Sequence, residues 1–177
     1  TEQFPFIKSK PKQYTIAIYN PKGDISTHQR YQLAFCIQLA KSLPDIKFIF
    51  YGGGDVDSTA TSNIEFRGWC TPQSIAEDSN VVLRITLHDG LPMNVVEFLL
   101  QGRDAITSVP GVEGAYFRGR GDFDSNLWED QLKRQIAQIR YIQKHPRKLK
   151  DRKEVSEYWR KELDPRRCKH KLSRWVR

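Results

Sequence analysis

The sequence predicts an α/β fold, in which a parallel β-sheet carries helices on its faces. Short apolar runs alternate with segments whose apolar residues recur at helical spacing, and glycine or proline separates most of them. The run NVVLRIT at 80–86 contains several β-branched residues in succession, as expected of a strand inside a parallel sheet. Ligands of such sheets bind beyond the carboxyl ends of the strands, so the loops at those ends are the first places to search for a site.

The elements follow in the order β-α-β-β-α-β-α-β after a polar, proline-containing linker. Pro44 ends the first helix, and Gly102 ends the third. Thr71 caps the second helix, with Pro72 in its first turn. The predicted ranges are a linker at 1–13, strands at 14–20, 46–51, 63–68, 80–86 and 104–108, and helices at 27–43, from 71 onwards and at 92–100.

The C-terminal part of the chain has a helical pattern and is strongly basic. We therefore divide the chain into a linker (1–13), an α/β domain (14–122) and C-terminal helices with a basic tail (123–177). Residues 133–177 hold 17 of the 29 Lys and Arg but only 5 of the 21 Asp and Glu, so the net charge of +8 comes from this segment. Such segments attract the phosphates of anionic lipids or nucleic acids, although the acidic residues within 151–164 also fit a solvated helix.

Composition indicates a cytoplasmic protein without a membrane span. No apolar run approaches the length of a span, and the N-terminus lacks the apolar core of a signal peptide. Cys36, Cys70 and Cys168 are far apart and odd in number, which favours reduced thiols over disulfides and does not match a metal site.

The stretch ITLHDGLPMNVVEFLLQG, at 85–102, carries the strongest functional signal. It follows a strand with polar residues and then begins an apolar helix that contains one carboxylate, Glu97. Gly90 lets a ligand approach the free N–H groups at the start of that helix, an arrangement that commonly binds phosphate. Asp89 precedes the helix and Glu97 tilts back towards its N-terminus, so both can contact one ligand. Taken singly, Glu97 is better explained as a solvent-facing residue and Asp89 as a helix-start carboxylate, but their combination with the strand, the glycine and Pro92 favours a ligand site.

This stretch resembles the signature of the retaining GT-B glycosyltransferases, also called the glycosyl transferases group 1 family. Their pattern is Ser-x-x-Glu-Gly-Leu-Pro, then a second Glu eight positions after the first, then Ala-x-x-x-Gly. Thr86 stands at the serine, Asp89 at the first glutamate and Glu97 at the second. The NPKG turn and the segments IKFIFYGGG and NIEFRG resemble further blocks of the family, so that the likeness covers about residues 14–118.

The resemblance implies a Rossmann-like domain that is the donor-binding half of a GT-B enzyme. The enzyme would transfer a hexose from a nucleoside diphosphate sugar to a hydroxyl acceptor, with retention and without a metal or cofactor. Asp89 would bind hydroxyls of the donor sugar and Glu97 those of the ribose, and these two are the predicted catalytic-site residues. The residues implied in binding the rest of the nucleotide-sugar are Lys22, Gly53, Trp69, Arg84, Thr86, His88, Gly90 and Leu91.

Within that set the implied roles differ. Lys22 would neutralise the diphosphate, and the base would lie against the loop that contains Trp69. Arg84 and His88 flank the motif and would touch phosphate or sugar, but an ion pair within the strand is an equally good role for Arg84. The chain departs from the family pattern in three ways: Asp89 is one methylene shorter than glutamate, Phe98 replaces the alanine, and the arginine usual after the first strand is absent unless Lys22 or Arg30 substitutes for it.

The implied partners are the nucleotide-sugar, a glycan or lipid-linked acceptor, and an N-terminal acceptor domain that this chain lacks. Residues 144–177 add an anionic membrane surface as a partner. The alternative function is a non-catalytic nucleotide- or phosphate-binding module whose basic tail docks on a membrane or nucleic acid, but it leaves 85–102 unexplained. The motif Asp55-Val56-Asp57 resembles the metal-binding Asp-x-Asp of GT-A glycosyltransferases, and a polar turn is the favoured interpretation.

Overall fold

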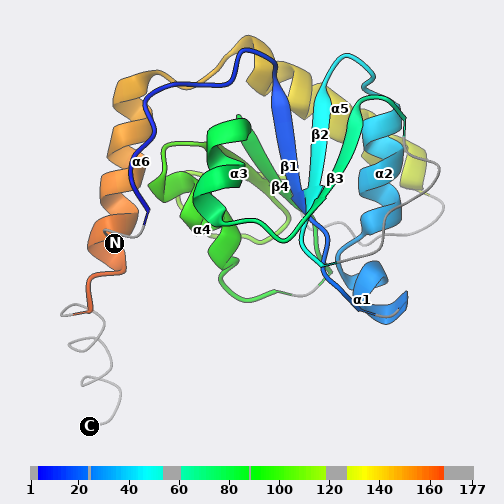
Figure 1. Ribbon diagram of the computed structural model, residues 1–177, viewed down its shortest axis with the longest axis horizontal. Coiled ribbons are helices and arrows are strands. Elements are labelled where there is room, and N and C mark those ends of the chain that lie inside the picture. The colour runs from blue at the N-terminus through cyan, green and yellow to red at the C-terminus, as the bar shows by residue number, and fades with distance from the viewer. Residues whose placement is uncertain (1–3, 24, 54–60, 88, 119–126, 166–177) are drawn as a thin grey trace, which may run out of the picture.

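A computed structural model describes residues 4–23, 25–53, 61–87, 89–118 and 127–165. These residues contain a six-stranded sheet with the order β3-β2-β1-β4-β5-β6, and every pair of neighbouring strands is parallel (Figure 1). The strands are β1 (Thr15–Tyr19), β2 (Lys47–Tyr51), β3 (Ile64–Gly68), β4 (Val81–Arg84), β5 (Asp104–Thr107) and β6 (Tyr116–Phe117). The predicted fold class is therefore confirmed.

Helices cover both faces of the sheet, because successive side chains of a strand point to opposite faces. Ile16 and Ile18 of β1 pack in one hydrophobic cluster with α2 and α5, whereas Ala17 between them packs in the other with α3, α4 and α6. The helices are α1 (Ile25–Arg30), α2 (Leu33–Lys41), α3 (Pro72–Asp78), α4 (Met93–Leu100), α5 (Trp128–Lys144) and α6 (Leu149–Glu162). Burial on both faces explains why the strands read as continuous apolar runs.

The helix predicted at 27–43 is two helices, α1 and α2. The break lies at Gln32, whose backbone is left-handed with a φ of 51°. The turn exposes the carbonyl of Arg30, which accepts a hydrogen bond of 3.0 Å from the amide of Leu87 in the loop after β4. Apolar periodicity runs through the break, so the sequence pattern did not reveal it.

Two other boundaries differ from the prediction. The helix expected to begin near Leu91 begins at Met93, because Pro92 has an extended backbone and occupies the N-cap position. The two-residue strand β6 was not predicted, since two residues are too short for a period-of-two pattern. The cap at Thr71 is confirmed: its side-chain oxygen accepts a hydrogen bond of 3.2 Å from the amide of Ser74.

The N-terminal segment, residues 4–12, lies along α6 (Figure 1). Arg152 of α6 donates a hydrogen bond of 3.0 Å to the carbonyl of Lys8. Near the other end of the helix, Arg160 donates one of 2.6 Å to the carbonyl of Phe4. The segment predicted as a linker is thus tied to the body of the domain by its backbone.

A cluster of charges lies beneath this segment, at the amino end of β5. Asp104 is buried at the first position of β5, with Lys10 Nζ at 3.6 Å and Arg147 Nε at 3.7 Å from its carboxylate oxygens. Arg103 and Arg152 are also buried near it, and burial, reinforced by Arg152, lowers the pKa of Arg103 to about 10. The carboxylate of Asp104 therefore lies among four basic side chains, those of Lys10, Arg103, Arg147 and Arg152, at this edge of the sheet.

Candidate functional site

A cleft of about 370 Å³ opens at the carboxyl edge of the sheet. Three of its lining residues are the last residues of three adjacent strands: Tyr51 of β2, Tyr19 of β1 and Arg84 of β4. The chain leaves β1 towards β2 on one side and β4 towards β5 on the other, so the strand order reverses here, where open α/β sheets bind ligands. The full lining is Tyr19, Tyr51, Trp69, Cys70, Pro72, Arg84, Asp89, Leu91, Pro92, Met93, Asn94 and Glu97.

Arg84 and Asp89 form an ion pair inside the cleft. Nε and Nη2 of Arg84 both donate to Oδ2 of Asp89, at 3.0 and 2.7 Å. The guanidinium also lies over the ring of Tyr31 at 4.3 Å and near that of Tyr19 at 5.8 Å. The ion pair that was one of two roles considered for Arg84 is present, and it joins two of the predicted site residues.

Glu97 lies on the first half of α4 and lines the same cleft. Its carboxylate has no hydrogen-bond or ion-pair partner among the residues that the structure describes, and burial raises its pKa above the ordinary value. A half-buried carboxylate without a donor is costly for a folded chain, which is typical of a group that awaits a ligand.

Aromatic rings form one wall of the cleft. The rings of Tyr19 and Tyr51 lie 5.6 Å apart and those of Tyr19 and Trp69 6.3 Å apart, measured between centroids. Trp69 is 72% exposed, so one large apolar face is open to the cleft and to solvent. Gly53 lies behind it: a Cβ at that position would be 2.6 Å from the indole nitrogen, so glycine is needed for Trp69 to keep this place.

The floor of the cleft is the start of α4. Its N-cap is Pro92, which offers no side-chain hydrogen bond to the first turn. Gly90 precedes it in an exposed loop, and a Cβ there would have no atom within 4 Å. The amide of Val95 donates to Oδ1 of Asn94 at 3.0 Å and to the carbonyl of Pro92 at 2.9 Å. The loop at Gly90 leaves room for an anion to approach the amides of Met93 and Asn94 at the start of α4.

The remaining predicted residues have mixed positions. Leu91 lines the cleft. Lys22 is exposed and is not a lining residue, but its Cβ is 3.2 Å from where a Cβ of Gly53 would be. Thr86 is buried, and its backbone exchanges two hydrogen bonds of 2.9 Å with the hydroxyl of Ser108, so it supports the cleft from below. His88, like Asp55 and Asp57, is outside the described residues.

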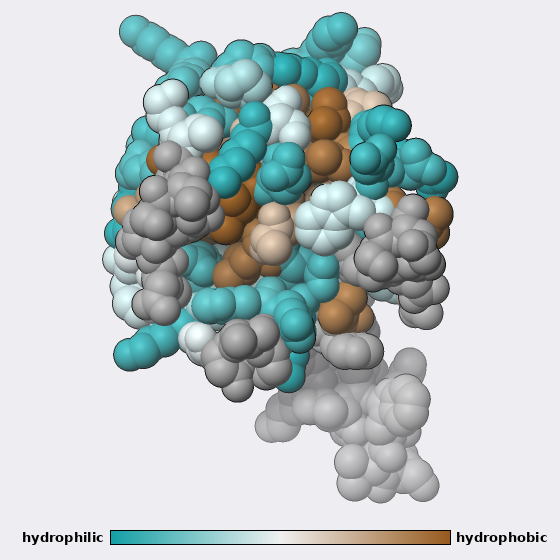
Figure 2. Space-filling view, turned by 90° about the vertical axis from the view of Figure 1, so that its right-hand side faces the viewer, coloured by the Kyte–Doolittle hydropathy of each residue, from teal (hydrophilic) through white to brown (hydrophobic). Residues whose placement is uncertain are grey.

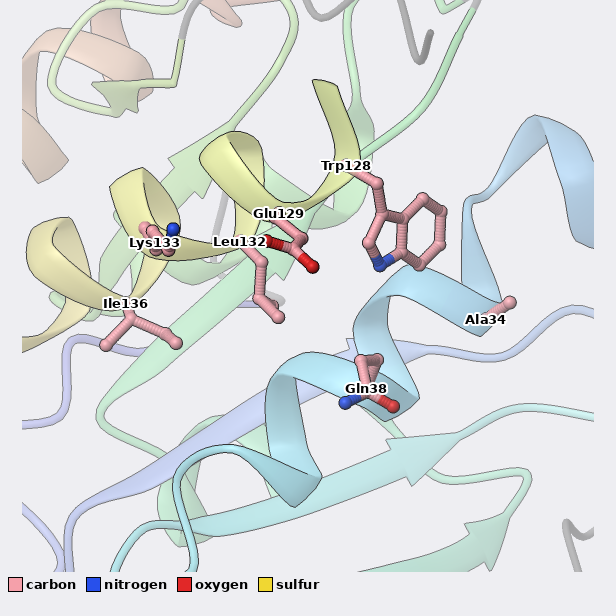
Figure 3. Close-up of a pocket in the computed structure, with 7 residues that line it drawn as sticks. All are labelled: Ala34, Gln38, Trp128, Glu129, Leu132, Lys133 and Ile136. Atoms are coloured by element: carbon pink, nitrogen blue, oxygen red, sulfur yellow. The ribbon is translucent and has the colours of Figure 1, made fainter. Parts of the chain in front are cut away.

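A larger hollow of about 570 Å³ lies elsewhere, between α2 and α5. Trp128, Leu132 and Ile136 extend from α5 towards Gln38 of α2 (Figure 3). Apolar surface gathers in the middle of the face shown in Figure 2 and polar surface surrounds it. None of the predicted site residues lines this hollow, and Glu129 and Lys133 are its only charged lining residues. Size alone does not identify the site.

No group of three or more His, Cys, Asp and Glu side chains gathers as a metal site within the described ranges. None of the helices in that part of the chain is long and apolar enough to cross a bilayer.

The sequence matches no protein-family model and no curated protein, but solved structures share its fold. HepE from Anabaena, in complex with UDP and glucose, has a TM-score of 0.67 at 9% identity, over 93% of this chain and 48% of HepE. The C-terminal domain of LpcC, a glycosyl transferase group 1 family protein from Francisella tularensis, has a TM-score of 0.58 at 12% identity, over 89% of this chain and 92% of that domain. This chain has the fold of the C-terminal half of a GT-B glycosyltransferase.

The GT-B likeness extends to complete enzymes. The pneumococcal O-GlcNAc transferase GtfA, in complex with UDP and GlcNAc, has a TM-score of 0.61 at 18% identity over 90% of this chain. The chain spans 37% of GtfA and 36% of TarM, for which the TM-score is 0.62 at 14% identity. It therefore corresponds to about a third of those chains.

Several residues of this GT-B half were not predicted to line the cleft. Tyr19 and Tyr51 carried a usable signal, since each is the last residue of its strand and parallel strands place those ends together. Asn94 had no such signal: its Nδ2 reaches the hydroxyl of Tyr51 at 3.4 Å, a contact between residues 43 positions apart.

Proposed function

We propose that this chain binds a nucleoside diphosphate sugar in the cleft at the carboxyl ends of β1, β2 and β4. One observation carries the proposal: the unpartnered carboxylate of Glu97, the exposed face of Trp69 and the open N-terminus of α4 line one cleft. A nucleoside diphosphate presents three matching chemistries, namely ribose hydroxyls, a flat base and a diphosphate.

Each part of the donor has a partner in this arrangement. Glu97 accepts hydrogen bonds from the ribose hydroxyls, and the base stacks on Trp69. The diphosphate meets the first turn of α4 and the cation of Lys22, and Asp89 accepts from a hydroxyl of the sugar. The UDP carried by HepE and by GtfA supports a uridine nucleotide as the first donor to test.

The reaction follows from the same proposal. A hexose passes from the nucleoside diphosphate to a hydroxyl of a glycan or lipid-linked acceptor, with retention and without a metal or cofactor, because helix dipole and cations stabilise the leaving diphosphate. The acceptor site belongs to an N-terminal domain that would close over the cleft. Asp89 and Glu97 are the proposed catalytic-site residues.

The proposed location is the cytoplasm, with contact at an anionic membrane. Cys36 and Cys70, the cysteines that the structure describes, are free thiols. Lys148, Leu149 and Lys150 are exposed at the start of α6 and would meet lipid head groups. Loss of vesicle binding at high salt would be expected of such a contact.

Calorimetric titration of the chain with UDP, GDP, ADP and dTDP, with and without Mg²⁺, tests the proposal. We expect saturable binding of one nucleotide that does not require the metal. Glu97→Ala should weaken it by at least about tenfold, because a charged hydrogen-bond acceptor is lost. Glu129→Ala is the matched control, since it removes a glutamate from the other hollow, and it should leave binding unchanged.

Equal affinities of both variants and the wild type would contradict the ribose assignment. A chain that binds none of the four nucleotides, yet binds an oligonucleotide or anionic vesicles in a salt-dependent way, would favour the alternative, a non-catalytic phosphate-binding module.

A further inference from the structure

We propose that Arg84 is a positioning residue for Asp89: it holds the carboxylate by one oxygen and leaves the other oxygen free for a hydroxyl of the donor sugar. This inference rests on the proposed function, because it assigns the way in which the same cleft recognises the sugar. Arg84 then acts on the sugar through Asp89 and not by contact with the diphosphate.

The hydrogen-bond pattern is the first support. Both bonds from the guanidinium end on Oδ2, at 3.0 and 2.7 Å, instead of spreading over the two oxygens as in a fork-to-fork pair. No described residue donates to Oδ1 of Asp89. The side chain of Asp89 is 21% exposed and lines the cleft, so a ligand in the cleft can reach it.

The second support is that Arg84 is itself held in place. It is 8% exposed, it ends strand β4 and it pairs with Thr107 of β5. The ring of Tyr31 lies 4.3 Å from the guanidinium carbon, in a position that follows from the break between α1 and α2. Arg84 is thus a rigid support, whereas Asp89 lies in the exposed loop between β4 and α4.

The third support is chemical. An aspartate on a loop has to be ordered before it can recognise a hydroxyl, and ordering a side chain at the moment of binding costs affinity. Two charge-assisted hydrogen bonds from a fixed arginine order it beforehand.

The competing role is direct binding of the diphosphate by Arg84, and the two roles can be separated. UDP contains the diphosphate but no sugar, whereas UDP-sugars contain both. We would titrate the wild type, Arg84→Met, Asp89→Asn and the double variant with UDP, UDP-glucose, UDP-galactose and UDP-GlcNAc.

Of the three UDP-sugars, the one that binds most tightly should have a higher affinity for the wild type than UDP has. Arg84→Met should leave the affinity for UDP within about twofold and weaken the UDP-sugar about tenfold, as Asp89→Asn does. In the double variant, the second substitution should add less than about twofold to the loss of affinity for the UDP-sugar, because both substitutions act on one interaction. Arg84→Lys, which can keep one bond to Oδ2, should recover part of the loss.

Other results would overturn the inference. A loss for UDP as large as that for the UDP-sugar in Arg84→Met would show that Arg84 binds the diphosphate, while nucleotide binding by the wild type would still support the proposed function. Independent losses that add in the double variant would also refute it. If the wild type bound neither UDP nor any UDP-sugar, the proposed function itself would fail and this inference with it.

Folding is checked by thermal unfolding of each variant. If Arg84→Met unfolds, Arg84→Lys and Asp89→Asn keep the test decisive, because both preserve most of the volume of the replaced side chain. The expected result is then that Arg84→Lys binds UDP as tightly as the wild type does, but binds the UDP-sugar more weakly. An equal loss of affinity for both ligands would refute the inference.

Discussion

The two edges of the sheet both collect charged residues but use them differently. At the amino edge, basic side chains surround the single carboxylate of Asp104 or donate to backbone carbonyls. At the carboxyl edge, Glu97 has no partner in the described part of the chain and Asp89 is held through one oxygen only. The first set of charges binds the protein to itself, and the second leaves acceptors open to a ligand.

The difference teaches that a buried charge alone does not identify a site. Arg103 is among the most deeply buried large side chains of the chain, yet it donates to the carbonyls of Ala76 and Ser9. The informative property of the carboxyl edge is the missing partner combined with a cleft. Substitutions at the two edges should therefore separate stability from binding.

The largest expected effect is at the amino edge. Asp104→Asn removes the carboxylate from among four basic side chains, which leaves buried cations uncompensated, so the free energy of unfolding should fall by about 3 kcal/mol. Urea denaturation measures this loss. Nucleotide affinity measured on the folded fraction should be unchanged, and a specific loss of affinity without a loss of stability would break the comparison.

The next effect is the pH dependence of binding at the carboxyl edge. Burial raises the pKa of Glu97, and a carboxylate accepts ribose hydroxyls better than the neutral acid. Nucleotide affinity should therefore fall as the pH drops through this raised pKa and level off above it. Calorimetric titrations from pH 7 downwards measure it. Glu97→Gln has no titrating group at this position, so it is the control that gives the contribution of the nucleotide's own phosphate.

The same substitution sharpens the comparison through stability. The folded-state pKa of Glu97 lies above its unfolded value, so stability is lost as the pH rises through the folded pKa. Glu97→Gln escapes that loss and should be at least as stable as the wild type at pH 7, although it binds nucleotide more weakly. A clear loss of stability would show that Glu97 has a structural role.

The smallest effect concerns the aromatic wall. Trp69→Ala removes the exposed face on which the base stacks, worth about 1 kcal/mol or roughly fivefold in nucleotide affinity. Stability should hardly change, because most of the indole is already exposed. Tyr141→Ala, which removes a ring that is 60% exposed on α5, is the control for both measurements. Equal affinities of the two variants would place the base elsewhere.

The sequence predicted the sheet and five of the twelve residues that line the cleft, because both depend on local patterns. Apolar runs, Pro44, Thr71 and the stretch around Glu97 are readable one segment at a time, and strand ends of a parallel sheet share an edge. The break at Gln32 was not readable, because apolar periodicity runs through it, and the bond between Arg30 and Leu87 that accompanies it joins residues far apart in the chain.

The role of Arg84 shows the same limit. Its position within a strand at 80–86 was predicted, but its two roles, ion pair or ligand contact, differ only in the direction of its side chain. That direction depends on Tyr31, which reaches it from another element. Pairings between distant side chains require the tertiary structure.

The hydrogen bonds of the N-terminal segment also set an order of assembly. The carbonyls of Lys8 and Phe4 accept from Arg152 and Arg160, at separations of 144 and 156 residues. On the ribosome, the first described residues to emerge must wait for nearly the last before these bonds can form. The β-strands can pair before that, so the docking of the N-terminal segment on α6 is a late step in folding. Closing so long a loop has a high entropic cost. A chain that ends before α6 would keep every residue of the sheet but could not form these hydrogen bonds.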